Sequence, residues 1–156
     1  MSISLVLADD HPLTREGMKA YLAKETDFNI LGSFADGESA WTGIQQLRPQ
    51  VALLDIRMPG IDGVALARKI KEASLPVASL MLTSYDAQQY VMASLRAGAR
   101  GYVLKTASME TLSKAIRIVA RGGFYLDSEV ANAVEQEGDF VPEPVSVRER
   151  EVLLLA

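Results

Sequence analysis

Carboxylate side chains come directly after two apolar segments of the chain, at points where strands would end. Asp9 and Asp10 follow the first apolar run, and Asp55 follows the third, just before a turn signal. Three carboxylates held close together repel one another, so at least one becomes protonated unless a cation lies between them. A hard dication with oxygen ligands, such as Mg²⁺, resolves that repulsion. If the two runs are neighbours, the sequence predicts a magnesium site on Asp9, Asp10 and Asp55.

A hydroxyl and an ammonium group occupy comparable positions farther along the chain. Thr83 follows the fourth apolar run, and Lys105 follows the fifth. An aspartate can act as a nucleophile and form an aspartyl-phosphate. Phosphoryl transfer depends mainly on positioning and charge neutralisation, which a metal ion and a lysine supply. The residue types therefore predict that Asp55 attacks and that Mg²⁺ on Asp10 and Asp55 neutralises charge. Lys105 would pair with the developing charge, and Thr83 would donate a hydrogen bond.

Each of these residues also has a purely structural interpretation. The acidic pair could cap a helix, Asp55 could occupy a turn, Thr83 could be a loop residue and Lys105 could be solvated. The structural interpretation needs a separate coincidence for each residue. A functional site explains with one cause why all these groups converge on one edge of a sheet, so we favour the site. His11 is interpreted as a structural neighbour of the acidic pair, because no carboxylate–histidine–nucleophile arrangement is evident around it.

The apolar runs predict the strands that must bring these residues together, at 3–8, 28–34, 51–54, 77–82 and 101–104. Several are nearly continuous in Val, Leu and Ile, as in parallel strands covered on both faces. Segments with helical spacing of apolar residues lie between and after them, at 12–23, 37–47, 63–72, 86–97 and 109–121. Pro12 suits a first helical turn, and Asp86 can cap the fourth helix.

Five strand–helix units with short connections predict an α/β fold. We expect a doubly wound, five-stranded parallel sheet with helices on both faces, right-handed crossovers and the flavodoxin-like strand order 2-1-3-4-5. In that order the first and third strands are neighbours at the point where the winding reverses. Ligands in such sheets bind beyond the carboxyl ends of the strands at that point. The predicted fold therefore places the polar residues where a ligand would bind.

The charge pattern of the chain changes after Arg121. Residues 1–121 contain 14 basic and 12 acidic residues, whereas 122–147 contain six acids and no base. We expect a first domain at 1–121, an acidic linker at 122–144 and the start of a capped amphipathic helix within 145–156. The net charge is −4, and neither part has the clustered positive charge that binding to a phosphate backbone requires.

The composition also indicates where in the cell the protein is located. The chain has no cysteine, so a disulfide framework and a thiolate metal site are excluded. No segment reads as a signal peptide, and none approaches the roughly 20 apolar residues that a membrane span needs. We therefore expect no membrane partner and a cytoplasmic location.

Together, these residues resemble the receiver domains of response regulators over roughly 3–121. The hallmarks of that family are an acidic pair after the first strand, a phosphorylated Asp after the third, a Thr or Ser after the fourth and a Lys after the fifth. The matching residues here are Asp9, Asp10, Asp55, Thr83 and Lys105.

The resemblance implies a role for each residue of the metal site. Asp10 and Asp55 would be direct Mg²⁺ ligands, Asp9 would act largely through water, and the backbone carbonyl of Arg57 would complete the protein's share. Asp55 would be the phosphoacceptor.

The resemblance also implies how the site communicates. Thr83 would move toward the phosphoryl group, and Tyr102 matches the family's switch aromatic and would fill the space that Thr83 leaves. Arg57 and Tyr85 occupy positions that tune the phosphoryl lifetime in receivers.

The local sequences around Asp10 and Lys105 look like those of the NarL/FixJ group, and 145–156 resembles the opening of a LuxR-type helix-turn-helix domain without its recognition helix. A sensor histidine kinase would supply the phosphoryl group. DNA would be bound only through the missing C-terminal domain. A homodimer would form on phosphorylation, either through the fourth helix, fifth strand and fifth helix or through the first and fifth helices.

Two alternatives remain. A phosphatase of the haloacid dehalogenase type also uses a strand-end Asp with Mg²⁺, but its motif needs a second Asp two residues on, where Arg57 stands. A pseudo-receiver that only dimerises or scaffolds would have lost an acidic residue or the lysine, and none is lost. We therefore expect that the protein is not an enzyme and that it catalyses only its own phosphorylation and dephosphorylation.

Overall fold

The structure of the protein is a computed structural model that describes residues 2–84 and 88–127. Three predictions fall outside those residues: the role of Tyr85, the helix cap at Asp86 and the helix expected within 145–156. The predicted linker at 122–144 is described only as far as Asp127.

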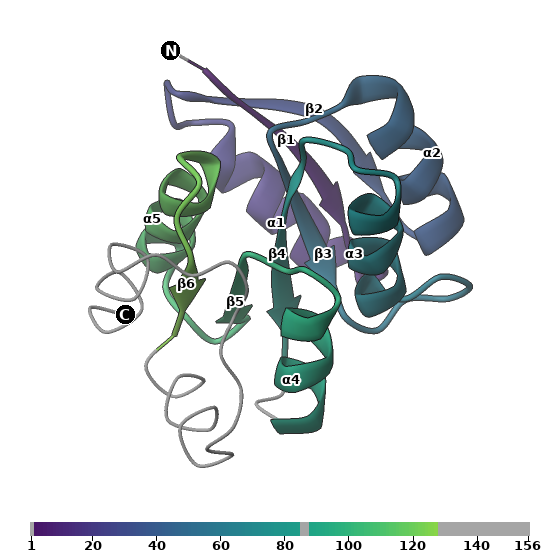
Figure 1. Ribbon diagram of the computed structural model, residues 1–156. Helices are drawn as coiled ribbons and strands as arrows, with labels where there is room; N and C mark the ends of the chain where they lie inside the picture. Colours follow the sequence, from purple (N-terminus) through teal and green to yellow (C-terminus); the bar gives the residue numbers. More distant parts are fainter. Residues whose placement is uncertain (1, 85–87, 128–156) are drawn as a thin grey trace.

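One parallel sheet forms the centre of the molecule (Figure 1). Its strand order is β2-β1-β3-β4-β5-β6, so the predicted flavodoxin-like order is confirmed. The third and fourth strands include Asp55 and Thr83 as their last residues. The strands are β1 Ile3–Ala8, β2 Phe28–Phe34, β3 Val51–Asp55, β4 Ala78–Thr83, β5 Gly101–Leu104 and β6 Tyr125–Leu126.

The sixth strand was not predicted and lies within the segment assigned to an acidic linker. β6 pairs in parallel with β5, with Tyr125 opposite Gly101 and Leu126 opposite Tyr102. Phe124, Tyr125 and Leu126 are all buried. A strand of two residues is too short to show a period along the sequence, so only its packing against β5 and the helix before it reveals it.

The helices predicted between 12 and 121 are present, with ends within two residues of those expected. They are α1 Pro12–Leu22, α2 Gly37–Leu47, α3 Gly63–Glu72, α4 Gln88–Arg96 and α5 Met109–Ala120. Three begin at side-chain caps: Asp36 accepts a hydrogen bond from Ser39 N and Asp62 from Ala65 N, both at 2.8 Å, and Ser108 accepts one from Thr111 N at 3.1 Å.

The helices cover both faces of the sheet, with α1 and α5 on one side and α2, α3 and α4 on the other (Figure 1). Alternate residues of β1 enter the two cores: Leu5 and Leu7 pack on the α1 and α5 side, and Val6 packs on the other. Burying one such side chain contributes about 1.5–3 kcal/mol. The two cores therefore hold the strands rigidly and fix the positions of their carboxyl ends.

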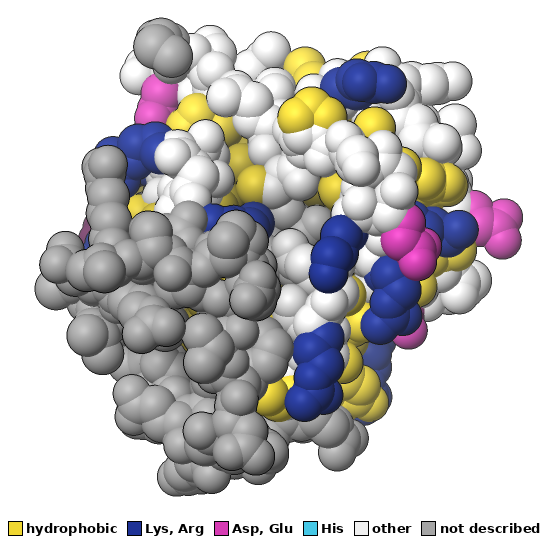
Figure 2. Space-filling view, viewed as in Figure 1, with side chains coloured by type: hydrophobic (Ala, Val, Ile, Leu, Met, Phe, Trp, Pro, Cys, Tyr) yellow, Lys and Arg dark blue, Asp and Glu magenta, His cyan; other side chains and the backbone are white. Residues whose placement is uncertain are grey.

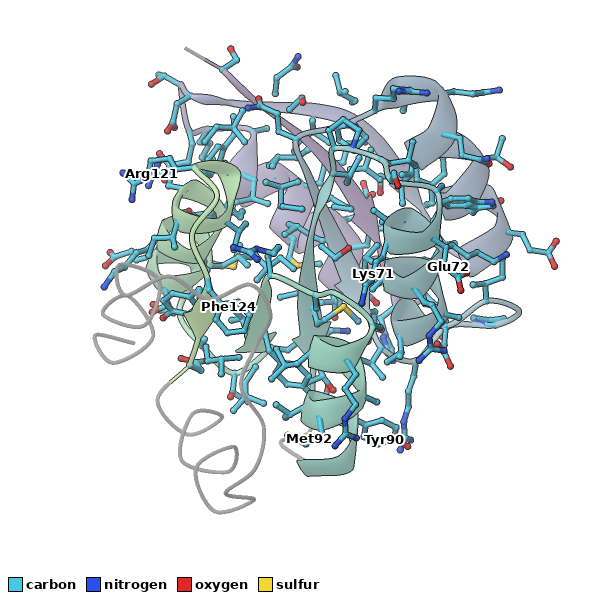
Figure 3. The ribbon with its side chains drawn as sticks, in the orientation of Figure 1. Lys71, Glu72, Tyr90, Met92, Arg121 and Phe124 are labelled. Carbon is cyan, nitrogen blue, oxygen red and sulfur yellow. The ribbon has the colours of Figure 1, made fainter. Side chains whose placement is uncertain are left out.

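Charged side chains of both signs lie over α3 and α4 on the face shown in Figure 2. Lys71 reaches from α3 toward the end of α4, where its Nζ donates to the carbonyl oxygen of Arg96 at 3.5 Å (Figure 3). Among the helices described here, none is both long enough and apolar enough to cross a membrane.

Candidate functional site

The strand register brings the predicted residues to one edge of the sheet. Ala8 is paired with Leu54, so Asp9 and Asp55 are next to each other at the ends of β1 and β3. Thr83 is paired with Leu104, so Lys105 follows directly beyond it. This edge is the switch point between β1 and β3, where ligands of doubly wound sheets bind.

Packing beneath the site holds Asp55 in place. Asp9, Asp55 and Thr83 are buried, at 0%, 4% and 3% exposure. Gly63 starts α3 directly against β3, and a side chain at this position would collide with the carbonyl oxygen of Asp55. The β3–α3 loop can therefore close tightly over the end of the strand.

Lys105 lies between the two buried carboxylates. Its Nζ is 2.9 Å from Asp9 Oδ2 and 3.2 Å from Asp55 Oδ2, and its side chain is only 12% exposed. Burial lowers the pKa of Lys105, but the hydrogen bonds and charges of Asp9 and Asp55 more than offset this, and the pKa lies above its ordinary value. The lysine therefore stays charged and supplies a fixed positive charge at the site.

The two buried carboxyl groups titrate differently. Burial raises the pKa of Asp9, but Lys105 and the donors of His11 outweigh it, and the pKa lies below its ordinary value. Burial also raises the pKa of Asp55, Lys105 offsets only part of this, and the charge of Asp9 raises it again, to about 6. The ionised form of Asp55 is therefore the one that burial and the charge of Asp9 disfavour.

The carboxylate oxygens of the cluster fit a hard dication. Asp9, Asp10, His11 and Asp55 each present one atom within 4.8 Å of the others. Asp10 Oδ1 is buried and accepts no hydrogen bond among the described residues, although His11 Nδ1 lies 3.2 Å away. Carboxylate oxygens with room for water are the ligands that Mg²⁺ prefers. The chemistry of this donor set thus agrees with the predicted magnesium site.

His11 lies inside the cluster. Its Nδ1 is 3.0 Å from Asp9 Oδ1, 3.6 Å from Asp55 Oδ2 and 3.4 Å from Lys105 Nζ. The sequence placed His11 beside the acidic pair but did not show that its ring would turn toward Asp55. Its position directly after that pair was the signal that could have indicated this contact.

Arg57 turns its side chain away from the carboxylates. Its backbone N–H donates to Asp55 Oδ1 at 3.4 Å, but its Nη2 donates to the hydroxyl of Tyr90 at 3.3 Å. The guanidinium carbon also lies 5.5 Å from the centre of the Tyr90 ring, within the range of a cation–π contact. Tyr90 projects from α4 (Figure 3), so Arg57 links the loop after Asp55 to that helix.

Tyr102 lies in the middle of β5 and is fully buried. It belongs to the core on the α2, α3 and α4 side of the sheet, together with Met81 and Val91. The predicted switch aromatic is therefore directed inward, beside the strand that ends in Thr83.

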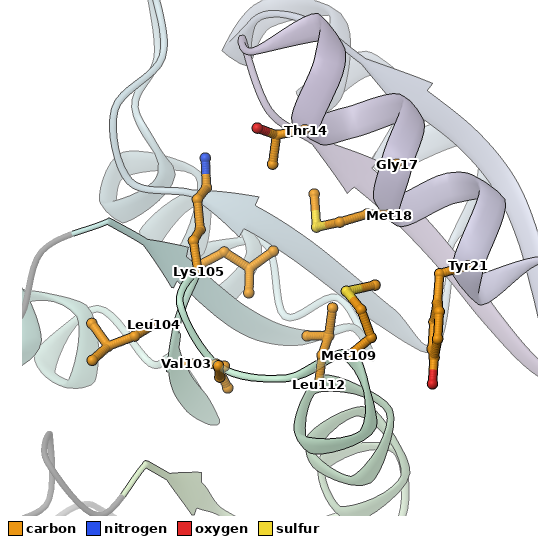
Figure 4. A pocket seen from close by; sticks show the side chains of 11 residues that line it. Thr14, Gly17, Met18, Tyr21, Val103, Leu104, Lys105, Met109 and Leu112 are labelled. Atoms are coloured by element: carbon orange, nitrogen blue, oxygen red, sulfur yellow. The ribbon is translucent and has the colours of Figure 1, made fainter.

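A separate apolar pocket lies between α1 and α5 (Figure 4). It has a volume of about 390 Å³, and Lys105 forms part of its wall, but the carboxylates of the site do not. Residues lining it include Gly17, Met18, Met109 and Leu112. This lining does not suit a metal ion or a phosphate.

A buried aspartate at a strand end, a lysine across from it and further carboxylates for a dication are the arrangement expected of a domain of the receiver class. The family model for the response regulator receiver domain matches residues 5–117. The chain therefore belongs to the response regulator receiver family, and the resemblance found in the sequence is confirmed.

Comparison with curated proteins finds transcriptional regulators. The chain is 37% identical to the transcriptional regulatory protein DegU of Brevibacillus brevis, over 86% of this chain and 57% of that protein. It is 36% identical to the probable transcriptional regulatory protein NarL of Mycobacterium tuberculosis, over 97% of this chain and 72% of that protein. The chain thus spans just over half the length of the first relative and about three quarters of the second.

Solved structures agree with the sequence comparison. The receiver domain of the response regulator NarL from M. tuberculosis matches with a TM-score of 0.76 and 36% identity, covering 78% of this chain and 98% of that one. A DNA-binding response regulator of the LuxR family from Staphylococcus aureus matches with a TM-score of 0.74 and 30% identity, covering 76% and 98%. The relatives therefore include the LuxR-type group that the sequence predicted.

Proposed function

We propose that Asp55 accepts a phosphoryl group from a sensor histidine kinase and that the resulting change of charge switches the conformation of this receiver. The observation that carries the proposal is the position of Asp55, buried at the end of β3 with its Oδ2 3.2 Å from Lys105 Nζ. Its neighbours Asp9 and Asp10 supply further ligands for a dication.

In the proposed reaction a carboxylate oxygen of Asp55 attacks the phosphorus atom of the donor. The new O–P bond forms as the N–P bond of the phosphohistidine breaks, and the bond's electrons go to the departing imidazole, which takes up a proton. Lys105 pairs with the negative charge of the transferred group, and Thr83 donates a hydrogen bond to it.

Mg²⁺ supplies charge neutralisation in this reaction when it is bound. Asp10, Asp55 and the backbone carbonyl of Arg57 would hold it directly, and Asp9 would act largely through water. Because the pKa of Asp55 is about 6, a nearby cation also favours the ionised form that is needed for attack.

The same residues account for switching and for the lifetime of the phosphoryl group. Thr83 moves to a phosphoryl oxygen, and Tyr102 adjusts in the space behind it. Tyr85, together with Arg57 once its side chain leaves Tyr90, restricts the water that hydrolyses the aspartyl-phosphate. The chain thus catalyses only its own phosphorylation and dephosphorylation, with no separate substrate.

For the whole protein we propose a cytoplasmic transcription regulator that binds DNA through a C-terminal domain, beyond a linker that begins after β6 and not at 122. Relatives bear the names of transcriptional regulators, which supports this output. Phosphorylation would promote a homodimer. Of the two surfaces considered, we propose that of α1 and α5, and the exposed Leu13 at the start of α1, beside Thr14 of the apolar pocket, supports it.

A variant of Leu13 tests this surface. Leu13 is 88% exposed, and Leu47, the other exposed large apolar residue among those described, is 40% exposed and lies on α2. We expect Leu13→Lys to weaken the phosphorylated dimer about tenfold, equivalent to about 1.4 kcal/mol, with Leu47→Lys as the unaffected control. Sedimentation of the phosphorylated protein measures both, and a dimer that Leu13→Lys does not weaken would favour the other surface.

The phosphoacceptor is tested by intact mass after incubation with acetyl phosphate and Mg²⁺. We expect one added phosphoryl group in the wild type and in Asp62→Asn, an exposed helix-cap control, and none in Asp55→Asn. An adduct that persists in Asp55→Asn would move the site elsewhere. No adduct in the wild type, under conditions that modify a control receiver, would favour a scaffold.

A further inference from the structure

His11 presents a ring nitrogen to the same carboxylates that would hold the magnesium ion. Its Nδ1 lies 3.0 Å from Asp9 Oδ1, 3.2 Å from Asp10 Oδ1 and 3.6 Å from Asp55 Oδ2. One donor atom from each of these four residues lies within 4.8 Å of all the others. A nitrogen donor is therefore part of the cluster, beside the oxygen donors.

The ring of His11 has no part in starting α1, and its Nδ1 contacts the cluster itself, including Asp9 Oδ1 at 3.0 Å and Lys105 Nζ at 3.4 Å. His11 is the N-cap residue of α1, but its side chain makes no capping hydrogen bond. The turn back to Asp9 is closed by the backbone N–H of His11, which donates to Asp9 Oδ1 at 2.8 Å. The side chain is 61% exposed, so the imidazole can adjust to the geometry of an ion without disturbing the core.

Divalent metals differ in the donors that they prefer. Mg²⁺ takes oxygen ligands and retains several waters, whereas Co²⁺, Ni²⁺ and Zn²⁺ bind imidazole nitrogen readily. An imidazole added to a set of carboxylates therefore strengthens the binding of these ions much more than that of Mg²⁺. Building on the proposed metal-binding role of the carboxylates, we infer that His11 is an additional ligand for first-row transition dications at this site.

The consequence is a site that distinguishes two classes of cation. A transition dication uses the carboxylates together with His11, and Mg²⁺ uses oxygen donors alone. The imidazole takes a coordination position that water or a phosphoryl oxygen would otherwise fill. A transition dication held in this way competes with Mg²⁺ for Asp10 and Asp55.

Calorimetric titration of the metal-free chain with CoCl₂ and with MgCl₂ tests this inference. The variants are His11→Ala and His11→Asn, and the second keeps a residue type that favours helix N-caps. We expect both to weaken Co²⁺ binding about tenfold or more, and Mg²⁺ binding less than about threefold. Lys19→Ala, an exposed change on α1, controls for effects of the helix alone.

Proton NMR of the Co²⁺-loaded protein gives a direct readout of the ligand. His11 is the only histidine of the chain, so a strongly shifted, exchangeable imidazole resonance can come from no other residue. We expect that resonance in the wild type and not in His11→Asn. Co²⁺ binding without the shifted resonance, or with unchanged affinity in both His11 variants, would overturn the inference.

Failure of this inference can be told apart from failure of the proposed function. A wild-type protein that gains a phosphoryl group with Mg²⁺ but binds Co²⁺ equally well with and without His11 retains the phosphoacceptor and loses only the imidazole ligand. A wild-type protein that binds neither ion and gains no phosphoryl group refutes both.

Discussion

Two regions of the molecule place one cation between two carboxylates. At the carboxyl edge of the sheet Lys105 lies between Asp9 and Asp55, 2.9 and 3.2 Å away. On the α1 and α5 side, Arg117 of α5 lies 2.8 Å from Asp27 and 3.6 Å from Glu25. The first group is buried, and the side chains of the second are roughly one third exposed.

The chemistry of the two cations differs as much as their burial. Arg117 makes two hydrogen bonds to Asp27, from Nε to Oδ2 at 2.8 Å and from Nη2 to Oδ1 at 3.0 Å, and stacks 4.8 Å from the centre of the Phe28 ring. Such a planar fork fixes one geometry, whereas a lysine ammonium is a point charge that can move between partners.

The carboxyl groups respond accordingly. The hydrogen bonds from Arg117 lower the pKa of Asp27 and outweigh burial, which opposes them. Burial raises the pKa of Asp55 to about 6, despite Lys105. One cluster therefore stabilises the fold, and the other retains unfavourable charge that a dication or a phosphoryl group can use.

The largest expected effect separates the two cations by function. Lys105→Met should slow phosphorylation by acetyl phosphate at least about 100-fold, because the transferred group loses its fixed positive charge. Arg117→Met should leave the rate within about twofold, since Arg117 contacts no residue of the site. Time courses of intact mass measure both rates. Equal losses of phosphorylation rate in the two variants would show that Lys105 acts through the fold and not on the transferred group.

A second expected effect is a gain of stability on removing the charge of Asp55. In the absence of metal near neutral pH, Asp55→Asn should raise the free energy of unfolding by roughly 1–3 kcal/mol, since one pKa unit corresponds to about 1.4 kcal/mol. Urea denaturation measures the change. Mg²⁺ should reduce the difference in unfolding free energy between the two proteins, because it stabilises the wild type. An Asp55→Asn variant less stable than the wild type would contradict the proposed charge repulsion.

The pH dependence of that difference in stability reports the pKa of Asp55. The pKa of Asp55 in the folded chain, about 6, lies above the value of about 3.9 in an unfolded chain. The protonated group therefore contributes stability that is present below about pH 4 and is lost as the pH rises through about 6. Melting temperatures of metal-free wild type and Asp55→Asn should converge at low pH and separate across this window. A constant separation would show that Asp55 titrates normally.

The smallest expected effect concerns the exposed pair. Asp27→Asn should lower the free energy of unfolding by about 0.2–1 kcal/mol, the usual contribution of an exposed ion pair. The loss should shrink at high salt, because solvent-exposed charges are screened. Urea denaturation at low and high NaCl measures both. A larger loss that salt does not change would mean that the Arg117 cluster behaves like a buried one.

Much of the fold could be predicted from local patterns. The strands 3–8, 28–34 and 101–104 have the predicted bounds. For 3–8 and 101–104 the reason is that a parallel strand buried on both faces requires a nearly continuous apolar run. α2 and α3 also begin and end as predicted, since Asp36 and Asp62 supply local caps. β6 escaped prediction because its stability comes from β5 and not from its own two residues.

Which residues stand at the strand ends follows from local sequence patterns, and the strand order implies that they meet at one edge. The directions of their side chains depend on tertiary packing. His11 turns to Asp55, and Arg57 turns away to Tyr90, 33 residues farther along the chain. Lys105 bridges two carboxylates that lie 96 and 50 residues earlier. Such contacts depend on rotamers chosen among packed neighbours and on burial, which no local pattern of residue types encodes.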